Sequence, residues 1–222
     1  GVRGLSIRGC SVSMPFKQEV IPHLDALDSS AEKVGAVNTI VNEGGQLTGY
    51  NTDVLSVVWA LEHLDIGQES SVLVLGAGGM ARAAVAALRR HGVDRISVSN
   101  RTVAKARALS DRVVPWDERH SQGVDLLINA TPLGMTPNDE EVPILLDRLS
   151  AFTALIDVIA LPPRSLLAHT AREMGIPTVP GYILSFHQSL AQFRLYTGVE
   201  PPKDAMFAAL SDALGVSPID LG

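Results

Sequence analysis

The sequence contains a single cysteine and lacks the histidine patterns of metal sites. With Cys10 alone in 222 residues, no disulfide can form within the chain, and a reducing, cytoplasmic setting is expected. The six histidines are scattered without an HxH or HxxxH pair, so no metal site is predicted. No signal peptide is visible at the start of the chain.

Basic residues and uninterrupted apolar runs are also scarce. Lys and Arg total 18 against 24 Asp and Glu, which gives a formal net charge of −6. Because no Lys/Arg cluster is long enough to suggest a basic face, nucleic acid is not a predicted partner. The most apolar stretch, Val72–Leu88, contains three separate glycine positions and Arg82, which excludes a membrane span. The hydrophobic content of 46% is that of a globular chain.

Apolar periodicity predicts an α/β protein. The predicted strands are Val37–Val41, Leu47–Tyr50, Val72–Leu75, Arg95–Ser99, Leu126–Ala130 and Ala154–Ile159. The predicted helices are Val54–Leu64, Ala81–Arg90, Val103–Leu109, Leu184–Tyr196 and Asp204–Leu214. Glu43–Gln46 is typical of a hairpin turn between the first two strands. Later strands alternate with helices, which indicates βαβ units and a parallel sheet.

A glycine-rich loop joins the strand Val72–Leu75 to the helix that follows. The segment Gly76–Ala81 fits the G-x-G-x-x-G/A pattern, in which Gly76 permits a tight turn and Gly78 lets the backbone approach a pyrophosphate. The amino end of the helix offers free N–H groups to phosphates. A plain βα turn is the alternative, but the order of strand, loop, helix and second strand favours a dinucleotide site.

The end of the second strand indicates which dinucleotide binds. NAD-binding chains usually place Asp or Glu there for the ribose 2′-hydroxyl. Here Ser99 is followed by Asn100, Arg101 and Thr102, and Arg101 suits charge-assisted hydrogen bonds with a 2′-phosphate. Lys105 adds a second cation one helical turn further on. NADP is therefore the predicted cofactor. The alternative is a solvated Arg101 beside an N-cap at Thr102.

Three polar residues of the first region are candidates for chemistry, each with a simpler alternative. Lys17 follows Pro15-Phe16 at the predicted start of a helix, where the helix dipole would favour proton exchange near neutral pH. A solvated lysine is the alternative. Asp53 precedes a predicted helix and is either a functional carboxylate or an N-cap, a role open to Thr52 as well. Asn38 lies in an apolar strand and either satisfies a backbone group or faces a ligand.

The ordered motifs of the chain resemble those of the shikimate dehydrogenase family. The matching segments are Ser11–Lys17, Gly35–Thr39, Gly49–Asp53, Gly76–Gly79, Asn100–Thr102, Asn129–Met135 and His187-Gln188. They follow the family's order over nearly the whole chain. Such a series is far more specific than one dinucleotide loop.

The resemblance implies an NADP-dependent oxidoreductase that reversibly reduces 3-dehydroshikimate to shikimate, a step of aromatic amino acid biosynthesis. It implies an α/β substrate domain at residues 1–65, a Rossmann-type parallel-sheet domain at residues 66–182, and carboxy-terminal helices at 183–222 that return to the substrate domain. Lys17 and Asp53 match the catalytic pair that handles the proton. The matching substrate ligands are Ser13, Asn38 and Gln188. The residues expected at the cofactor are Gly76, Ala77, Gly78, Gly79, Met80, Asn100, Arg101, Thr102, Lys105, Val158 and Gly181.

The sequence also departs from the family pattern. The family's amino-terminal segment, with its serine pair for the substrate carboxylate, is absent from these residues, so a truncated substrate domain is expected. Ala160 stands where the family normally has tyrosine, and Leu184 stands where it has methionine. These changes resemble the shikimate-dehydrogenase-like branch, in which the catalytic pair persists. The substrate class is therefore shikimate or a close cyclic polyol acid, with quinate or an amino-shikimate analogue left open.

Two other functions stay open at this point. Quinate dehydrogenase would more often use NAD, and Arg101 counts against it. A non-catalytic nucleotide-binding regulator with the same fold would not need Lys17 and Asp53. A small-molecule substrate is the predicted partner, and the sequence leaves a homodimer open.

Overall fold

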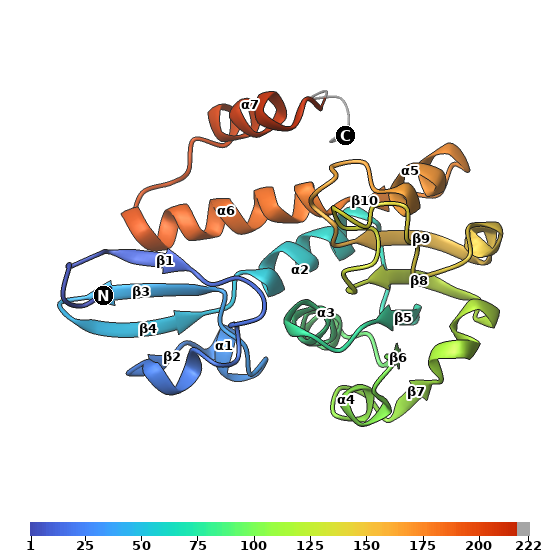
Figure 1. Cartoon of the computed structure of the whole chain (residues 1–222), viewed down its shortest axis with the longest axis horizontal. Helices are drawn as coiled ribbons and strands as arrows, with labels where there is room; N and C mark the ends of the chain where they lie inside the picture. The colour runs from blue at the N-terminus through green and yellow to red at the C-terminus, as the bar shows by residue number, and fades with distance from the viewer. Residues whose placement is uncertain (217–222) are drawn as a thin grey trace.

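The computed structural model describes residues 1–216, which form two sheets connected by helices (Figure 1). The smaller sheet has the strand order β1-β3-β4-β2, and the larger has the order β10-β9-β8-β5-β6-β7. The long helix α6 (Gly181–Thr197) runs beside both sheets, and α7 (Lys203–Leu214) lies on its outer side. The α/β class with a parallel sheet is as predicted, and the last six residues of the predicted region 183–222 lie outside the described residues.

The smaller sheet is built around the predicted hairpin. β3 (Thr39–Glu43) and β4 (Gln46–Tyr50) pair antiparallel, with Glu43 opposite Gln46. Gly44 and Gly45 between them have φ of 60° and 94°, the left-handed conformation that two-residue hairpin turns require. The other elements here are β1 (Gly9–Ser11), a 3₁₀ helix at Ile21–His23, β2 (Ala26–Leu27) and α1 (Ser29–Glu32).

Lys17 does not begin a helix, and that part of the prediction is wrong. Residues 14–20 form a series of turns. The carbonyl oxygen of Lys17 accepts a hydrogen bond from Val37 N–H at 2.7 Å, so it is not available to a helical turn. The N–H of Ile21 bonds to Gln18 instead. A contact with a distant segment thus overrides the local signal, and Lys17 does not lie in the first turn of a helix of its own.

The larger sheet is parallel throughout. Its strands are β5 (Ser71–Leu75), β6 (Arg95–Ser99), β7 (Arg112–Val114), β8 (Val124–Asn129), β9 (Phe152–Asp157) and β10 (Thr178–Val179). β5 lies between β6 and β8, so the strand order reverses there, and ligands of such sheets bind beyond the carboxyl ends of the strands at that point. β7 and β10 are too short for an apolar run to predict. β9 ends at Asp157, before the predicted end at Ile159.

Helices cover both faces of the larger sheet. On one face, Val72 and Val74 of β5 pack against α2 (Asp53–His63), α3 (Gly79–Arg90) and α6. On the other face, Leu73 and Leu75 pack against α5 (Leu166–Glu173) and the 3₁₀ helix Leu146–Ala151. The remaining elements are α4 (Val103–Arg107) and the 3₁₀ helix Trp116–Ser121. β5 is therefore buried on both faces, as its continuous apolar sequence predicts.

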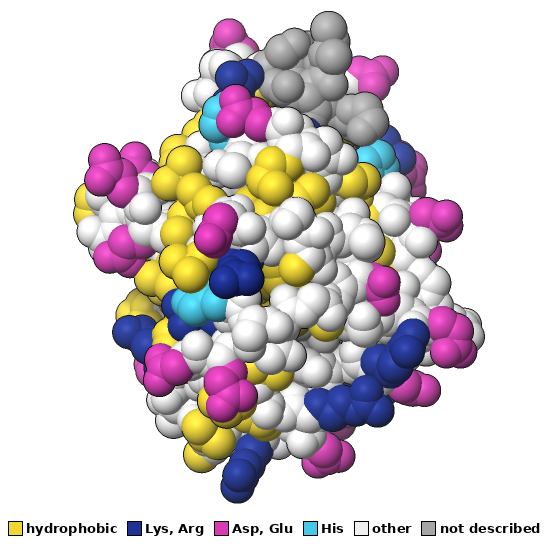
Figure 2. Space-filling model, turned by 90° about the vertical axis from the view of Figure 1, so that its right-hand side faces the viewer, with side chains coloured by type: hydrophobic (Ala, Val, Ile, Leu, Met, Phe, Trp, Pro, Cys, Tyr) yellow, Lys and Arg dark blue, Asp and Glu magenta, His cyan; other side chains and the backbone are white. Residues whose placement is uncertain are grey.

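Three features bear on nucleic acids, membranes and metal ions as partners: the surface charge, the length of the helices and the grouping of metal-ligating side chains. On the face in Figure 2, Lys and Arg side chains lie in separate groups among Asp and Glu side chains. No described helix is long and apolar enough to cross a lipid bilayer. Within residues 1–216, no three His, Cys, Asp or Glu side chains come together in a way that could hold a metal ion.

Candidate active site

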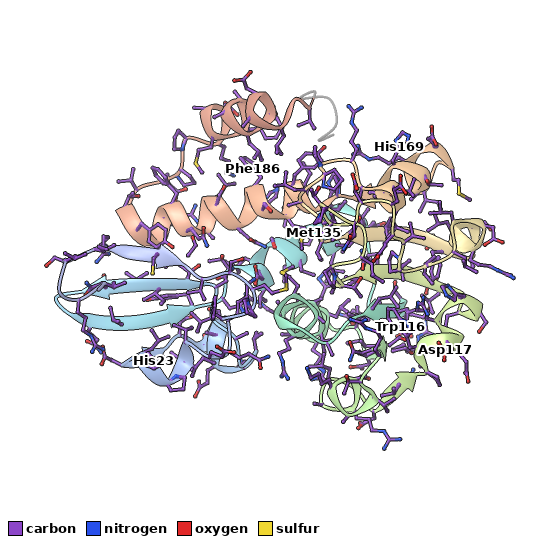
Figure 3. All side chains as sticks on the ribbon, in the orientation of Figure 1. His23, Trp116, Asp117, Met135, His169 and Phe186 are labelled. Atoms are coloured by element: carbon purple, nitrogen blue, oxygen red, sulfur yellow. The ribbon has the colours of Figure 1, made fainter. Side chains whose placement is uncertain are left out.

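A cleft of about 550 Å³ lies where the two sheets face each other, at the carboxyl ends of β5 and β8. Its walls are formed by the loops that follow β5, β8 and β9, by the turns before α1 and by residues of α2, α3, α4 and α6. The lining includes Ser13, Lys17, Gln18, Asp53, Ala77, Gly78, Gly79, Met80, Arg82, Lys105, Ala130, Thr131, Pro132, Met135, Val158, Ile159, Gly181, Leu184, Ser185 and Gln188. Met135 is labelled in Figure 3, near the centre of the view.

Lys17 and Asp53 meet in this cleft as an ion pair. Lys17 Nζ lies 2.6 Å from Asp53 Oδ2, and the side chains are 16% and 0% exposed. Asp53 is the first residue of α2, but it does not serve as the N-cap. Asn51 Oδ1 instead accepts from the N–H groups of Asp53 and Val54, at 3.1 and 3.4 Å. The Asp53 carboxylate is thereby left for the lysine.

Asn38 is buried behind Asp53 and is not among the cleft-lining residues. Its Nδ2 donates to Asp53 Oδ1 and to Thr52 Oγ1, each at 2.9 Å. Its Oδ1 accepts from Thr52 N–H and from Thr39 Oγ1, each at 2.8 Å. The amide is thus fully engaged with protein groups, and its evident role here is to hold the Asp53 carboxylate in place.

The glycine loop brings the two halves of the cleft together. Gly76 has φ of 108°, and a Cβ there would lie 2.6 Å from the carbonyl oxygen of Ala130, so only glycine fits. A Cβ at Gly78 would meet no atom within 4 Å, which leaves open space above the start of α3. A Cβ at Gly79 would lie 3.1 Å from Lys17 Cδ. The stem of Lys17 therefore crosses directly over the loop predicted to hold the cofactor.

The residues after β6 are only partly gathered at the cleft. Lys105 lines it, whereas Asn100, Arg101 and Thr102 do not. Arg101 is exposed, and Asn100 Nδ2 donates to the Thr102 carbonyl oxygen at 3.0 Å. Thr102 precedes α4 without capping it through its side chain. Arg101 and Lys105 are thus both exposed, and of the two only Lys105 lines the cleft.

Helix α6 places further predicted residues on the opposite wall. Gly181 lies so close to β9 that a Cβ there would be 2.5 Å from the Val158 carbonyl carbon. Gln188 lines the cleft one residue after His187, whose ring stacks on Trp59 of α2 at 3.7 Å. Burial, with smaller effects of the charges on Lys203 and His63, lowers the pKa of His187 to about 4. The neutral imidazole therefore joins α6 to α2 and fixes the turn that bears Gln188.

Arg82 lines the cleft but belongs to none of the motifs identified in the sequence. It lies on the first turns of α3 and lines the cleft, and its Nε is buried without a hydrogen-bond partner among the described residues. A buried donor without a partner costs about 1–3 kcal/mol, so an anionic ligand would satisfy it. This donor and the open space at Gly78 fit a phosphate group at the start of α3. In the sequence, this residue is marked only by being an arginine among the alanines at the start of a helix.

The comparisons with known proteins agree with this geometry. Residues 1–40 match the family described as shikimate dehydrogenase substrate binding domain, and residues 59–130 match the family described as shikimate / quinate 5-dehydrogenase. The NADP(+) shikimate dehydrogenase of Halothermothrix orenii is 36% identical over 220 residues, covering 90% of this chain and 76% of that protein. The chain belongs to the shikimate dehydrogenase family.

Two further members of the family are similar over nearly the whole chain. A shikimate dehydrogenase-like protein of Haemophilus influenzae is 35% identical, with 96% of this chain and 80% of that protein covered. The crystal structure of the Thermus thermophilus shikimate 5-dehydrogenase in complex with NADP(H) and shikimate has a TM-score of 0.82 and 33% identity, covering 96% of this chain and 81% of that one. The family resemblance, the Rossmann-type fold and the oxidoreductase class inferred from the sequence are confirmed.

Proposed function

We propose that this shikimate dehydrogenase family member reversibly reduces 3-dehydroshikimate to shikimate, or a close cyclic polyol acid, with NADPH. The observation that carries the proposal is the Lys17–Asp53 pair, which lies in the cleft and directly over the glycine loop. A ketone that receives a hydride also needs a proton at its oxygen. When bound, NADPH supplies that hydride.

Lys17 is the residue we assign to the proton. Its Nζ is held by Asp53 Oδ2, and Asn38 fixes the other carboxylate oxygen from behind. The lysine is therefore held in one position at the cleft, where it can donate to the carbonyl oxygen in reduction and accept in oxidation. Because the carboxylate is fully buried, water does not compete for the lysine on that side.

The remaining site residues are assigned by their place in the cleft. Ser13 and Gln188 line it beside Lys17 and are proposed as hydrogen-bond partners of the substrate's hydroxyl groups. Val158 and Gly181 form the wall proposed to face the nicotinamide. The glycine loop and Arg82 are proposed to hold the diphosphate. This places substrate recognition on residues 1–65 and α6, and cofactor recognition on residues 66–182.

Other aspects of the proposal rest on the sequence. We propose a cytoplasmic location, which the single cysteine favours, and a homodimer is the assembly we propose to test by light scattering. Quinate remains the second candidate substrate, since the matching family description includes quinate. A regulator without activity is disfavoured, because the buried Lys17–Asp53 pair is costly to maintain without a proton-transfer role.

The experiment is a direct assay of NADP reduction with shikimate, with quinate and with neither acid. We expect NADPH to form with shikimate and little to form in the control without acid. Turnover of quinate alone would favour the second candidate. Tight NADPH binding with no turnover of either acid would contradict the proposed activity and favour the regulator.

Cofactor choice gives a second prediction. Replacing Arg101 and Lys105 together by serine removes both cations proposed to bind the 2′-phosphate. We expect the KM for NADP to rise about tenfold or more, since hydrogen bonds between charged groups contribute about 1.5–3 kcal/mol each. The KM for NAD should stay unchanged. Arg107→Ser, an exposed position on the same helix away from the cleft, is the matched control. A wild-type preference for NAD would contradict the assignment.

A further inference from the structure

The carboxylate of Asp157 is buried below the cleft and binds donors from three segments. It is the last residue of β9 and is fully shielded from solvent. Its Oδ1 accepts from Asn129 Nδ2 at 2.8 Å and from Ile159 N–H at 3.3 Å. Its Oδ2 accepts from Ser165 Oγ. No site motif of the sequence includes this residue, and it does not line the cleft.

Asn129 extends the network into the loop after β8. Its Oδ1 accepts from Thr131 Oγ1 at 2.7 Å and from Thr131 N–H at 3.1 Å. Its carbonyl oxygen accepts from Val158 N–H at 3.0 Å. Thr131 in turn accepts from Leu133 N–H at 3.2 Å. The cleft-lining residues Thr131 and Val158 are therefore fixed relative to each other through Asn129.

Ser165 and Gly181 complete the connection. Ser165 Oγ accepts from Ala168 N–H at 3.2 Å and so caps α5 while it donates to Asp157. The backbone that follows Asp157, at Val158 and Ile159, is the surface against which Gly181 packs. One buried side chain thus sets the position of the β8 loop, the β9 loop and the start of α6.

We propose that Asp157 is a positioning residue for the nicotinamide, because it holds the Thr131 and Val158 segments together as one wall of the cleft. The inference rests on the proposed function for its assignment of that wall to the nicotinamide. The site is costly for a charge: burial raises the pKa of Asp157 to about 6, although hydrogen bonds from Ser165, Asn129 and Ile159 counteract it. A residue that served only as sheet core would be more stable as an apolar side chain.

A second carboxylate of the same sheet provides a matched control. Asp125 Oδ2 accepts from Ser71 N–H at 2.7 Å and from Ser71 Oγ at 2.8 Å. Asp125 and Ser71 lie near the amino ends of β8 and β5, at the end of the sheet opposite to the cleft. Removing this pair perturbs the sheet without touching the cleft wall.

The experiment compares two ligands on Asp157→Ala, Asp157→Asn and Asp125→Ala. Asp157→Ala leaves Ser165 Oγ without its acceptor and leaves Asn129 Nδ2 with only the Leu133 carbonyl oxygen at 3.4 Å. Asp157→Asn keeps an oxygen for Asn129 and Ile159. For Asp157→Ala we expect the Kd of NADPH to rise about tenfold, because the wall formed by Thr131 and Val158 is no longer held in one position against the nicotinamide. The Kd of 2′-phospho-ADP-ribose, which lacks the nicotinamide, should change less than about twofold. Asp157→Asn should recover most of the NADPH affinity, and Asp125→Ala should keep all of it.

The outcomes separate this inference from the proposed function. Equal weakening of both ligands by Asp157→Ala, or a loss of thermal stability with unchanged NADPH affinity, would assign Asp157 to the fold and overturn the inference alone. If the wild-type chain neither binds NADPH nor uses it, the proposed function fails first. Should Asp157→Ala not fold, Ser165→Ala removes the donor to Oδ2 and should shift the two Kd values in the same unequal way.

Discussion

Replacing Lys17 by alanine is expected to lower kcat about 10²–10⁴-fold, the contribution typical of a positioned acid–base group. The Kd of NADPH should change little, because the contact between Lys17 and Gly79 is with the aliphatic stem and its loss opens space rather than closing it. The variant also leaves the buried Asp53 without its cation. A loss of about 3–5 kcal/mol in the free energy of unfolding is expected from that alone.

The measurement is a steady-state assay with NADP and shikimate, alongside NADPH fluorescence titration and thermal unfolding. Lys33→Ala serves as the control, since Lys33 is an exposed lysine of the same region and does not line the cleft. A Lys17→Ala enzyme that keeps more than about a tenth of the wild-type kcat at a temperature where it is folded would remove Lys17 from the chemistry.

Replacing Asn38 by aspartate is expected to have the second largest effect. The substitution keeps the shape of the side chain but exchanges the Nδ2 donor, 2.9 Å from Asp53 Oδ1, for a carboxylate oxygen. Two buried carboxylates at that distance cannot both be ionised, so they would share a proton at neutral pH. The two residues then carry one negative charge between them, so Asp53 becomes a weaker partner of Lys17. We expect kcat to fall about 10²-fold at neutral pH and the unfolding free energy to fall by about 3 kcal/mol.

The sign of the pH dependence distinguishes this effect from a loss of packing. The shared proton is bound in the folded variant and released on unfolding, so the stability of Asn38→Asp should fall relative to wild type as pH rises. Asn42→Asp is the control: Asn42 is a buried asparagine of β3, which begins directly after Asn38, and its Nδ2 donates to the backbone carbonyls of Val2 and Ile7. A kcat loss equal in the two variants, with parallel pH curves, would contradict the role assigned to Asn38.

Elements with strong local signals could be predicted from the sequence. Gly44 and Gly45 define the hairpin because few other residues adopt positive φ, and the apolar run Val72–Leu75 indicates a strand buried on both faces. Gly76 is required by both its φ and its contact with Ala130, so the dinucleotide loop is visible as a pattern. The positive φ angles and the apolar run depend on local backbone geometry, which neighbouring residues in the sequence determine, whereas the contact of Gly76 with Ala130 arises only in the folded chain.

Features that depend on distant contacts could not be predicted. The turns at Lys17 form because the N–H of Val37 donates a hydrogen bond to the Lys17 carbonyl oxygen. No local sequence pattern indicates a hydrogen-bond partner 20 residues away. Thr52 is the N-cap residue of α2, but its side chain is bonded to Asn38 and does not cap the helix. The side chain that accepts from the first N–H groups belongs to Asn51, while the Asp53 carboxylate faces Lys17. The short strands β7 and β10 exist through pairing with their neighbours.

Residue types at fixed spacing predict the α/β class with a parallel sheet and NADP as the cofactor, and the ordered motifs predict the family. The pair Lys17 and Asp53 is predicted only through the resemblance to that family, and its catalytic role remains our proposal. The tertiary structure decided what those residues do for one another. Asn38 lies behind the Asp53 carboxylate and does not line the cleft, and the aliphatic stem of Lys17 lies over Gly79. The structure also draws attention to Arg82, through its buried Nε, and to Asp157, through its hydrogen-bond network. The physical reason is that burial and hydrogen-bond partners, which define these roles, arise only when segments distant in the sequence pack together.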